Sequence, residues 1–256
     1  MKEKKISIGG LVLNYKMAGS GPALLILHGW GGSSDSWIKV QENLAKENLT
    51  VIVPDFPGFG ESLTPPNPWG TVEYADFILK FINELKLDNF FLLGHSFGGR
   101  IAIKLFDFCP EKIKKLILCN SAGLKPKPSL KDKTIFLVAK IGNAIFTPGP
   151  LARLRDGARN MFYIFLRHRD YVKANGTMKE TLKKVLGDDF LENLNSIKCP
   201  TLIIWGENDK LIPVEYSFLF KEKIENSQLK IFPRTGHSPH LEKPKKLSQA
   251  ILDFLF

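Results

Sequence analysis

Short apolar runs alternate along this chain with segments that have a helical pattern of hydrophobic residues. The runs lie at Ala23–Leu27, Val51–Val53, Phe90–Leu93, Leu116–Cys119 and Thr201–Trp205, with Lys230–Phe232 as a weaker last member. Runs that are apolar on both faces are typical of parallel strands covered by helices. The helical patterns lie at Asp35–Glu47, Val72–Leu85, Gly99–Phe108, Val214–Ile224 and Lys245–Phe254. This alternation predicts an α/β fold with a mostly parallel sheet.

A β-hairpin is predicted before these runs. Residues of opposite character alternate in Lys5–Ile8 and in Leu11–Ala18, and the Gly9-Gly10 pair between them suits a tight turn. With the six later runs, the hairpin gives an eight-stranded sheet flanked by helices.

One interval between predicted strands is unusually long. From Leu124 to Lys198, about 75 residues lie where a crossover between parallel strands needs far fewer. Helical patterns occur within it at residues 131–145, 151–168 and 177–186. Ligands of open α/β sheets bind at the carboxyl ends of the strands, so we expect a helical cap over that edge. The predicted division is a core of residues 1–123 and 199–256 with a cap of residues 124–198, and an independent domain unrelated to the site is the alternative.

Positive charge is concentrated in the same interval. The whole chain has a net charge of +10, and residues 124–198 hold fifteen Lys or Arg against seven Asp or Glu, a net of +8. The chain shows no nucleic-acid-binding motif with aromatic residues among the basic ones, so we predict no nucleic-acid partner. A solvated lysine-rich surface is the simplest interpretation, and attraction of acidic substrates or of a membrane face is the alternative.

The cysteines and the apolar segments indicate the compartment. Cys109, Cys119 and Cys199 are scattered and lie in or beside apolar segments, which favours reduced thiols in a cytoplasmic protein. The N-terminus has no apolar signal-peptide core. The stretch Thr134–Leu151 is interrupted by polar residues and falls short of the ~18 apolar residues of a membrane span. We therefore predict no integral membrane segment, and the sequence indicates no oligomeric state.

A sharp turn is predicted at Gly94-His95-Ser96-Phe97-Gly98. It follows the run Phe90–Leu93 and precedes the helical pattern Gly99–Phe108. A strand that turns directly into a helix strains the corner residue, and the flanking glycines allow close packing where a Cβ would clash. The side chain of Ser96 would stand exposed above the sheet, which is the setting of a serine nucleophile.

Further motifs occur in the order and spacing of a known family. They are His28-Gly29-Trp30-Gly31-Gly32, Asp55-Phe56-Pro57-Gly58-Phe59-Gly60-Glu61-Ser62, Trp205-Gly206-Glu207-Asn208-Asp209 and Gly236-His237. Together with the turn around Ser96 they resemble the α/β-hydrolase superfamily, over nearly the whole chain outside the predicted cap. The resemblance implies the α/β-hydrolase fold and a nucleophile, Ser96, that needs a base to take its proton.

Five histidines compete for the role of that base. His237 follows the last predicted strand, where the family places its catalytic histidine, so the resemblance implies His237. His240 lies three residues later and is the alternative. His28 resembles the family's structural His-Gly pair, His95 should point away from the nucleophile, and we expect His168 to be exposed on a cap helix.

A carboxylate must orient the imidazole and stabilise its charged form. Asp209 follows the run Thr201–Trp205, and the resulting chain order of nucleophile, acid and base is that of this fold. Glu207 in the same turn is the alternative acid. Asp55 belongs to a segment that the family also carries, and we interpret it as turn-forming.

Negative charge that develops on the substrate oxygen requires fixed donors. The backbone N–H of Phe97 is one candidate, because Phe97 opens a helix whose N-terminal end is positively polarised. The resemblance implies the backbone N–H of Trp30 as the second donor of this oxyanion hole. A merely tight turn at Gly29–Gly32 is the alternative.

No cofactor and no metal site are predicted. His237-Ser238-Pro239-His240 has two imidazoles, but no cysteine or third histidine lies nearby, and the proline argues against a helical ligand pair. The chain has no G-x-x-x-x-G-K-[ST] phosphate loop, and Gly29–Gly32 lacks the spacing of a dinucleotide-binding fingerprint.

The predicted function is a cofactor-independent serine hydrolase. Its simplest form is a carboxylesterase that forms an acyl-enzyme on Ser96 from small to medium apolar esters, since the apolar stretch Ile135–Phe146 favours a hydrophobic pocket. Hydrolysis of a carbon–carbon bond next to a ketone is the alternative, because Asn120–Leu124 resembles the entry into the cap of such enzymes. The candidates for their arginine contact to the substrate carboxylate are Arg153, Arg155, Arg159 and Arg167. Lactonase, thioesterase and amidase activity stay open, as does a small-molecule receptor with slow turnover.

Overall fold

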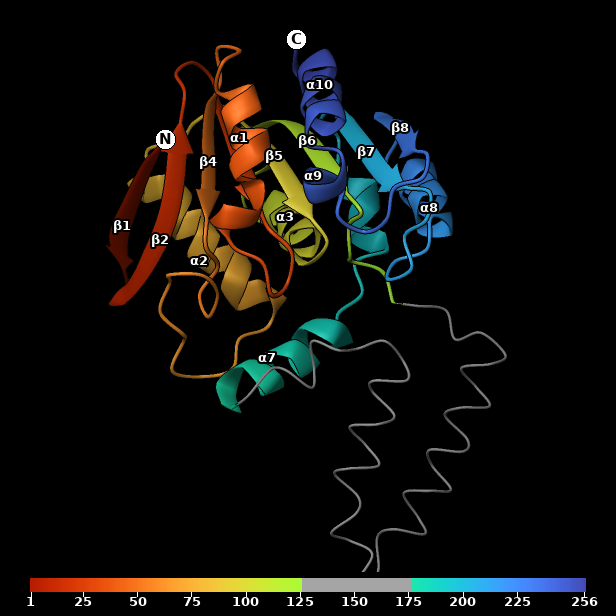
Figure 1. Cartoon of the computed structure of the whole chain (residues 1–256). Coiled ribbons are helices and arrows are strands. Elements are labelled where there is room, and N and C mark those ends of the chain that lie inside the picture. The colour runs from red at the N-terminus through yellow and green to blue at the C-terminus, as the bar shows by residue number, and fades with distance from the viewer. Residues whose placement is uncertain (126–175) are drawn as a thin grey trace, which may run out of the picture.

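The structure is a computed structural model that describes residues 1–125 and 176–256. In these ranges the chain forms an eight-stranded sheet in the order β1-β2-β4-β3-β5-β6-β7-β8 (Figure 1). The strands are β1 (Lys2–Ile8), β2 (Leu11–Ala18), β3 (Ala23–Leu27), β4 (Thr50–Pro54), β5 (Phe90–His95), β6 (Ile113–Cys119), β7 (Thr201–Gly206) and β8 (Ser227–Phe232). Strand β2 pairs antiparallel with β1 and β4, and the other neighbours pair in parallel. The prediction of a mostly parallel eight-stranded sheet is confirmed.

Helices cover both faces of this sheet, with α1 and α10 on one face and α2, α3 and α8 on the other (Figure 1). The α-helices are α1 (Ile38–Leu44), α2 (Thr71–Glu84), α3 (Phe97–Phe108), α7 (Gly176–Gly187), α8 (Glu215–Lys223), α9 (Pro239–Glu242) and α10 (Pro244–Leu255). The 3-10 helices are η1 (Ser34–Trp37), η2 (Pro110–Lys112) and η4 (Glu192–Ser196).

The segment predicted as one helix from Asp35 to Glu47 is divided. It begins as η1, where the Ser33 side chain accepts a hydrogen bond from the Asp35 backbone N–H, and continues as α1 only to Leu44. Shortly after this end, Asn48 adopts a φ of 51°, a left-handed conformation that asparagine tolerates and that turns the chain towards β4. Hydrophobic periodicity alone did not predict that the helix ends at Leu44.

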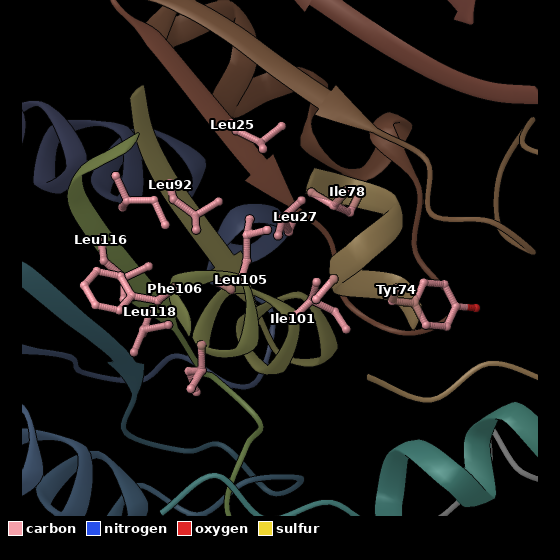
Figure 2. Close-up of a cluster of buried hydrophobic side chains, with 14 of the residues drawn as sticks. Leu25, Leu27, Tyr74, Ile78, Leu92, Ile101, Leu105, Phe106, Leu116 and Leu118 are labelled. Carbon is pink, nitrogen blue, oxygen red and sulfur yellow. The ribbon is translucent and has the colours of Figure 1, made fainter. Parts of the chain in front are cut away.

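Alternation along the central strands buries both faces of the sheet. On β5, Leu92 faces α2 and α3 whereas Leu93 faces α1 and α10, and neither side chain is exposed. Figure 2 shows Leu92 together with Leu116 and Leu118 of β6, pointing from the sheet towards α3. Burying a leucine side chain stabilises the fold by about 1.5–3 kcal/mol. These residues therefore hold the strand that leads to Ser96 rigidly in place.

Residues 126–175 lie outside the described ranges, and with them two of the predicted cap helices and His168. The third predicted cap helix corresponds to α7, which lies beside the loop after β4 (Figure 1). Thr181 Oγ1 accepts a hydrogen bond from the Trp69 backbone N–H at 3.0 Å, and Lys184 Nζ donates to the Pro68 carbonyl at 2.8 Å.

The chain on either side of the undescribed residues meets at one place. The backbone N–H of Phe190 donates to the carbonyl oxygen of Gly123 at 2.8 Å. From there, Leu194 and Ile197 are fully buried in the core against α3. The interval that interrupts the α/β alternation thus leaves and re-enters the core at adjacent points.

The state of the cysteines and the length of the helices can be compared with the predictions of reduced thiols and of no membrane span. Cys109 and Cys119 are buried, Cys199 is half-buried, and the three sulfurs are free thiols. Burial raises the pKa of both Cys109 and Cys199 to about 11. Within residues 1–125 and 176–256, no helix combines the length and the apolar character needed to cross a bilayer.

Candidate active site

Ser96 occupies the corner between β5 and α3. Its backbone has φ 51° and ψ −116°, a combination that residues other than glycine rarely adopt. The corner is this tight because a Cβ at Gly98 would overlap the Leu27 carbonyl on β3, and one at Gly94 would overlap the backbone of α3. The two glycines thus let the helix start directly against the sheet, and Ser96 is held above the carboxyl ends of the strands.

Three side chains from distant parts of the chain form a continuous hydrogen-bonded series. Ser96 Oγ lies 2.9 Å from His237 Nε2, and His237 Nδ1 lies 2.8 Å from Asp209 Oδ2. An ionised carboxylate only accepts hydrogen bonds, so Nδ1 carries the ring proton and Nε2 is free to accept from the serine hydroxyl. The Asp209 side chain is fully buried, whereas that of His237 is 16% exposed and reachable from outside.

Four N–H donors surround the carboxylate of Asp209. Oδ1 accepts from the backbone of Leu211 at 2.8 Å and of Ile212 at 3.0 Å, and Oδ2 accepts from Asn120 Nδ2 at 2.6 Å in addition to His237. Burial by itself raises the pKa of Asp209, but the hydrogen bond and charge of His237, together with the hydrogen bonds from Asn120 and Ile212, lower the pKa below its usual value. Asp209 is therefore ionised at neutral pH.

Asn120 received no role from the sequence beyond its place in the segment 120–124. It lies directly after β6, is fully buried, and has a φ of 44°. Because β6 and β7 are parallel neighbours, the residues that follow them meet at one sheet edge, and this adjacency is the signal that could have linked Asn120 with Asp209.

The alternative acid and the alternative base lie elsewhere. Glu207 is exposed, and its carboxylate accepts from the backbone N–H of Arg234 at 2.9 Å. His240 is buried and stacks on Trp37, with ring centroids 4.4 Å apart. The hydrogen-bonded series from Ser96 includes neither of them.

His28 and Asp55 hold the neighbouring loops in place. His28 Nε2 accepts from the Phe56 backbone N–H at 2.9 Å, so Nδ1 is the donor to the Gly29 carbonyl at 2.8 Å. Burial lowers the pKa of His28, consistent with this neutral form. The buried carboxylate of Asp55 accepts from the backbone N–H of Ser34 at 2.6 Å. Both side chains therefore bond to loop backbone.

The two backbone amides predicted to bind an oxyanion flank Ser96. Phe97 follows Ser96 at the first position of α3, and Trp30 lies in the loop after β3. That loop passes close to Ser96, since a Cβ at Gly29 would lie 3.3 Å from Ser96 Cβ. Neither N–H donates to another group in the part of the chain that the structure describes. Both are therefore available to a bound ligand.

An aromatic surface adjoins these amides. The ring centroid of Trp30 lies 4.8 Å from that of Phe59 and 5.4 Å from that of Phe97, and Trp30 and Phe59 are partly exposed. A carbonyl compound with an apolar substituent could pack on this surface beside the hydroxyl. Among the described residues, no three His, Cys, Asp or Glu side chains are grouped as metal ligands.

Comparisons with known proteins agree with this architecture. The family model described as alpha/beta hydrolase fold matches residues 22–143 and 144–244. A 2-hydroxy-6-oxononadienedioate/2-hydroxy-6-oxononatrienedioate hydrolase of Pseudomonas putida is 27% identical over 276 residues, which cover 98% of this chain and 95% of that protein. A monoacylglycerol lipase of Mus musculus is 27% identical over 259 residues, covering 93% of this chain and 76% of the lipase.

A solved structure is similar over its whole length. A thermophilic esterase from Thermogutta terrifontis, determined with malate bound, superposes with a TM-score of 0.73 at 26% identity, covering 100% of this chain and 98% of the esterase. The family model covers residues 22–244, and these residues include the six strands from β3 to β8. The resemblance found in the sequence motifs is thereby confirmed, and this chain belongs to the alpha/beta hydrolase fold family.

Proposed function

We propose that this protein is a cofactor-independent serine hydrolase with Ser96 as nucleophile, His237 as general base and Asp209 as the orienting acid. The observation that carries the proposal is the continuous series from Ser96 Oγ through the imidazole to the carboxylate, at 2.9 and 2.8 Å. Both distances are within the reach that proton transfer requires.

The first half-reaction forms an acyl-enzyme. Ser96 Oγ attacks the carbonyl carbon of the substrate while its proton passes to His237 Nε2, and Asp209 stabilises the imidazolium. The substrate oxygen becomes negatively charged and accepts from the backbone N–H groups of Trp30 and Phe97. When the tetrahedral intermediate collapses, the bond to the leaving group breaks, and His237 returns the proton to the departing alcohol.

The second half-reaction repeats this chemistry with water. A water molecule gives a proton to His237 Nε2 and attacks the carbonyl carbon of the acyl-enzyme. Collapse breaks the ester bond to Ser96, whose oxygen takes the proton back from His237. The carboxylic acid leaves, and the free enzyme is restored.

Small to medium apolar carboxylic esters are the proposed substrates. The partly exposed rings of Trp30 and Phe59 offer an apolar surface next to Ser96. The similarity to an esterase at 26% identity over the whole chain supports the same class of reaction.

Two variants and one covalent probe test this function. Ser96→Ala and His237→Ala should each remove nearly all hydrolysis of a panel of p-nitrophenyl esters, because nothing else in the series can attack or take the proton. A fluorophosphonate should label the wild type at Ser96 and leave Ser96→Ala unlabelled. Multiple turnover that persists in either variant would contradict the assignment.

Hydrolysis of a carbon–carbon bond beside a ketone is the second candidate. The supporting observation is the similarity, over 98% of this chain, to a hydrolase whose name gives a dienedioate substrate. A dienone diacid of that type and a p-nitrophenyl ester separate the two candidates. Faster consumption of the dienone would favour carbon–carbon hydrolysis, and faster consumption of the ester would favour the carboxylesterase.

We also propose that the interval 124–198 provides a cap over the site before the chain re-enters the core at Phe190, and that the protein acts in the cytoplasm. The position of α7 beside the loop after β4 supports the cap, since that loop contributes Phe59 to the aromatic surface. The three free thiols support a reducing compartment.

A further inference from the structure

His95 is a buried histidine that the proposed reaction does not use. It is the last residue of β5, next to Ser96, and its Nε2 lies 2.8 Å from the carbonyl oxygen of His237. A carbonyl oxygen only accepts, so Nε2 carries the proton and donates it. The end of β5 is therefore joined to His237 twice, once through the serine hydroxyl and once through this bond to the backbone.

The imidazole of His95 is fixed by packing on several sides. A Cβ at Gly29 would lie 2.9 Å from His95 Nδ1, so the loop after β3 covers the ring closely. The ring of His240 meets it edge-on at 4.6 Å, and His240 is stacked on Trp37 at an interplanar angle of 5°. Strand β5, the loop after β3 and helix α9 thus fix the orientation of the His95 ring and of its Nε2–H group.

The surroundings of His95 also keep it neutral. Its Nδ1 is buried and has no hydrogen-bond partner within the described ranges. Burial, together with the nearby His240 and His237, holds the pKa of His95 well below its usual value. A neutral ring suits this position, because the ring of His237 is 5.1 Å away and becomes positively charged during the proposed reaction.

We propose, on the basis of the hydrolase function proposed above, that His95 is a positioning residue for His237. Its Nε2–H holds the backbone of His237 against the end of β5, and this sets the separation of Ser96 Oγ and His237 Nε2. A histidine at this place supplies a donor of the right reach without a charge beside the base. The bond acts on proton transfer and leaves substrate binding unchanged.

The test compares His95→Phe with His95→Gln. Phenylalanine keeps the ring but has no donor, and glutamine places an amide N–H near the position of Nε2. For a p-nitrophenyl ester, we expect His95→Phe to lower kcat about ten- to hundredfold with KM within about twofold of wild type. His95→Gln should recover kcat to within about threefold. The rate of Ser96 labelling by a fluorophosphonate should follow kcat in both variants.

A matched control and a second pair complete the design. His240→Phe keeps a ring stacked on Trp37 and edge-on to His95, and no hydrogen bond joins His240 to Ser96, His237 or Asp209 in the described ranges, so its kcat should stay within about twofold of wild type. If His95→Phe does not fold, His95→Asn replaces it, because its amide is one methylene too short to reach the carbonyl. Asparagine should then be impaired where glutamine is active.

Two results would overturn the role of His95. The first is a kcat of His95→Phe or His95→Asn that stays within about threefold of an active wild type. The second is a kcat of His95→Gln that is as low as that of His95→Phe or His95→Asn. Both outcomes leave the hydrolase function intact. A wild-type protein that neither turns over esters nor is labelled at Ser96 would instead remove the proposed function, and the role of His95 with it.

Discussion

Replacing Asp209 with asparagine changes one oxygen into an NH2 group and leaves the shape of the site almost unaltered. The carboxylate accepts from two backbone N–H groups through Oδ1, and from His237 and Asn120 through Oδ2. The asparagine oxygen can serve only one of these pairs. If the amide turned away from the backbone pair, it would leave two N–H groups without an acceptor, at about 1–3 kcal/mol each.

The favoured orientation therefore keeps the oxygen on the backbone and turns the NH2 group towards His237 Nδ1. Two donors cannot share a hydrogen bond, so the ring proton of His237 moves to Nε2. That nitrogen then no longer accepts from the Ser96 hydroxyl. The loss of the correct tautomer costs about 10⁴-fold in kcat in sites of this kind, or about 5 kcal/mol of transition-state stabilisation.

The assay is the kcat for a p-nitrophenyl ester, measured for Asp209→Asn beside Glu207→Gln. Glu207 is a carboxylate two residues away that bonds to a loop backbone, so its variant should keep kcat within about threefold of wild type. The tautomer reasoning is refuted if Asp209→Asn retains more than a tenth of the wild-type kcat, or if Glu207→Gln loses as much as Asp209→Asn.

Three further predictions concern the surroundings of this site. Asn120→Leu removes a hydrogen-bond donor to the charged carboxylate of Asp209, and such a bond contributes about 1.5–3 kcal/mol. The kcat for the same ester should therefore fall about ten- to hundredfold. An unchanged kcat would show that the bond is dispensable. Leu92→Ala, in the core of Figure 2, should lower the free energy of unfolding in urea by about 2–5 kcal/mol, whereas Leu211→Ala, which is 56% exposed, should change it by less than about 0.5 kcal/mol. Burial and the neighbouring His237 lower the pKa of His240 in the folded chain from 6.5 to about 3. Between these two pH values the unfolded chain binds a proton at His240 and the folded chain does not. The free energy of unfolding therefore falls as the pH falls below 6.5. Between pH 7.5 and 5.5, His240→Phe should therefore lose about 1.4 kcal/mol less unfolding free energy than wild type, and equal losses would contradict the buried neutral form.

The sequence predicted the elements whose pattern is local. Runs that are apolar on both faces marked the parallel strands, and strand β5 lies within one or two residues of the run Phe90–Leu93. The start of β1 at Lys2 was missed, because that strand lies at the sheet edge and is exposed over most of its length, where lysine and glutamate are tolerated on both faces. Helix α9 was missed because four residues are too few to show a helical period.

The site was predictable to the extent that motifs fix it. Motif order predicted Ser96, His237 and Asp209 as a group but gave no information about the contacts between them. The structure joins them in a hydrogen-bonded series. Asn120 and His95 could not be found in the same way. The contact of Asn120 depends on which strands are neighbours in the sheet, and that of His95 depends on the orientation of a buried ring. A local sequence motif predicts neither property.

The hydrogen bond between Gly123 and Phe190 has a consequence for how proteins of this shape diversify. Residues 67 positions apart in the chain are in direct contact there, so the core is closed independently of the length of chain that joins them. Lengthening a loop between fixed ends costs little, about 0.6 kcal/mol for each doubling. Exchange of the joining segment can therefore leave the core, and the hydrogen-bonded series that starts at Ser96, unchanged.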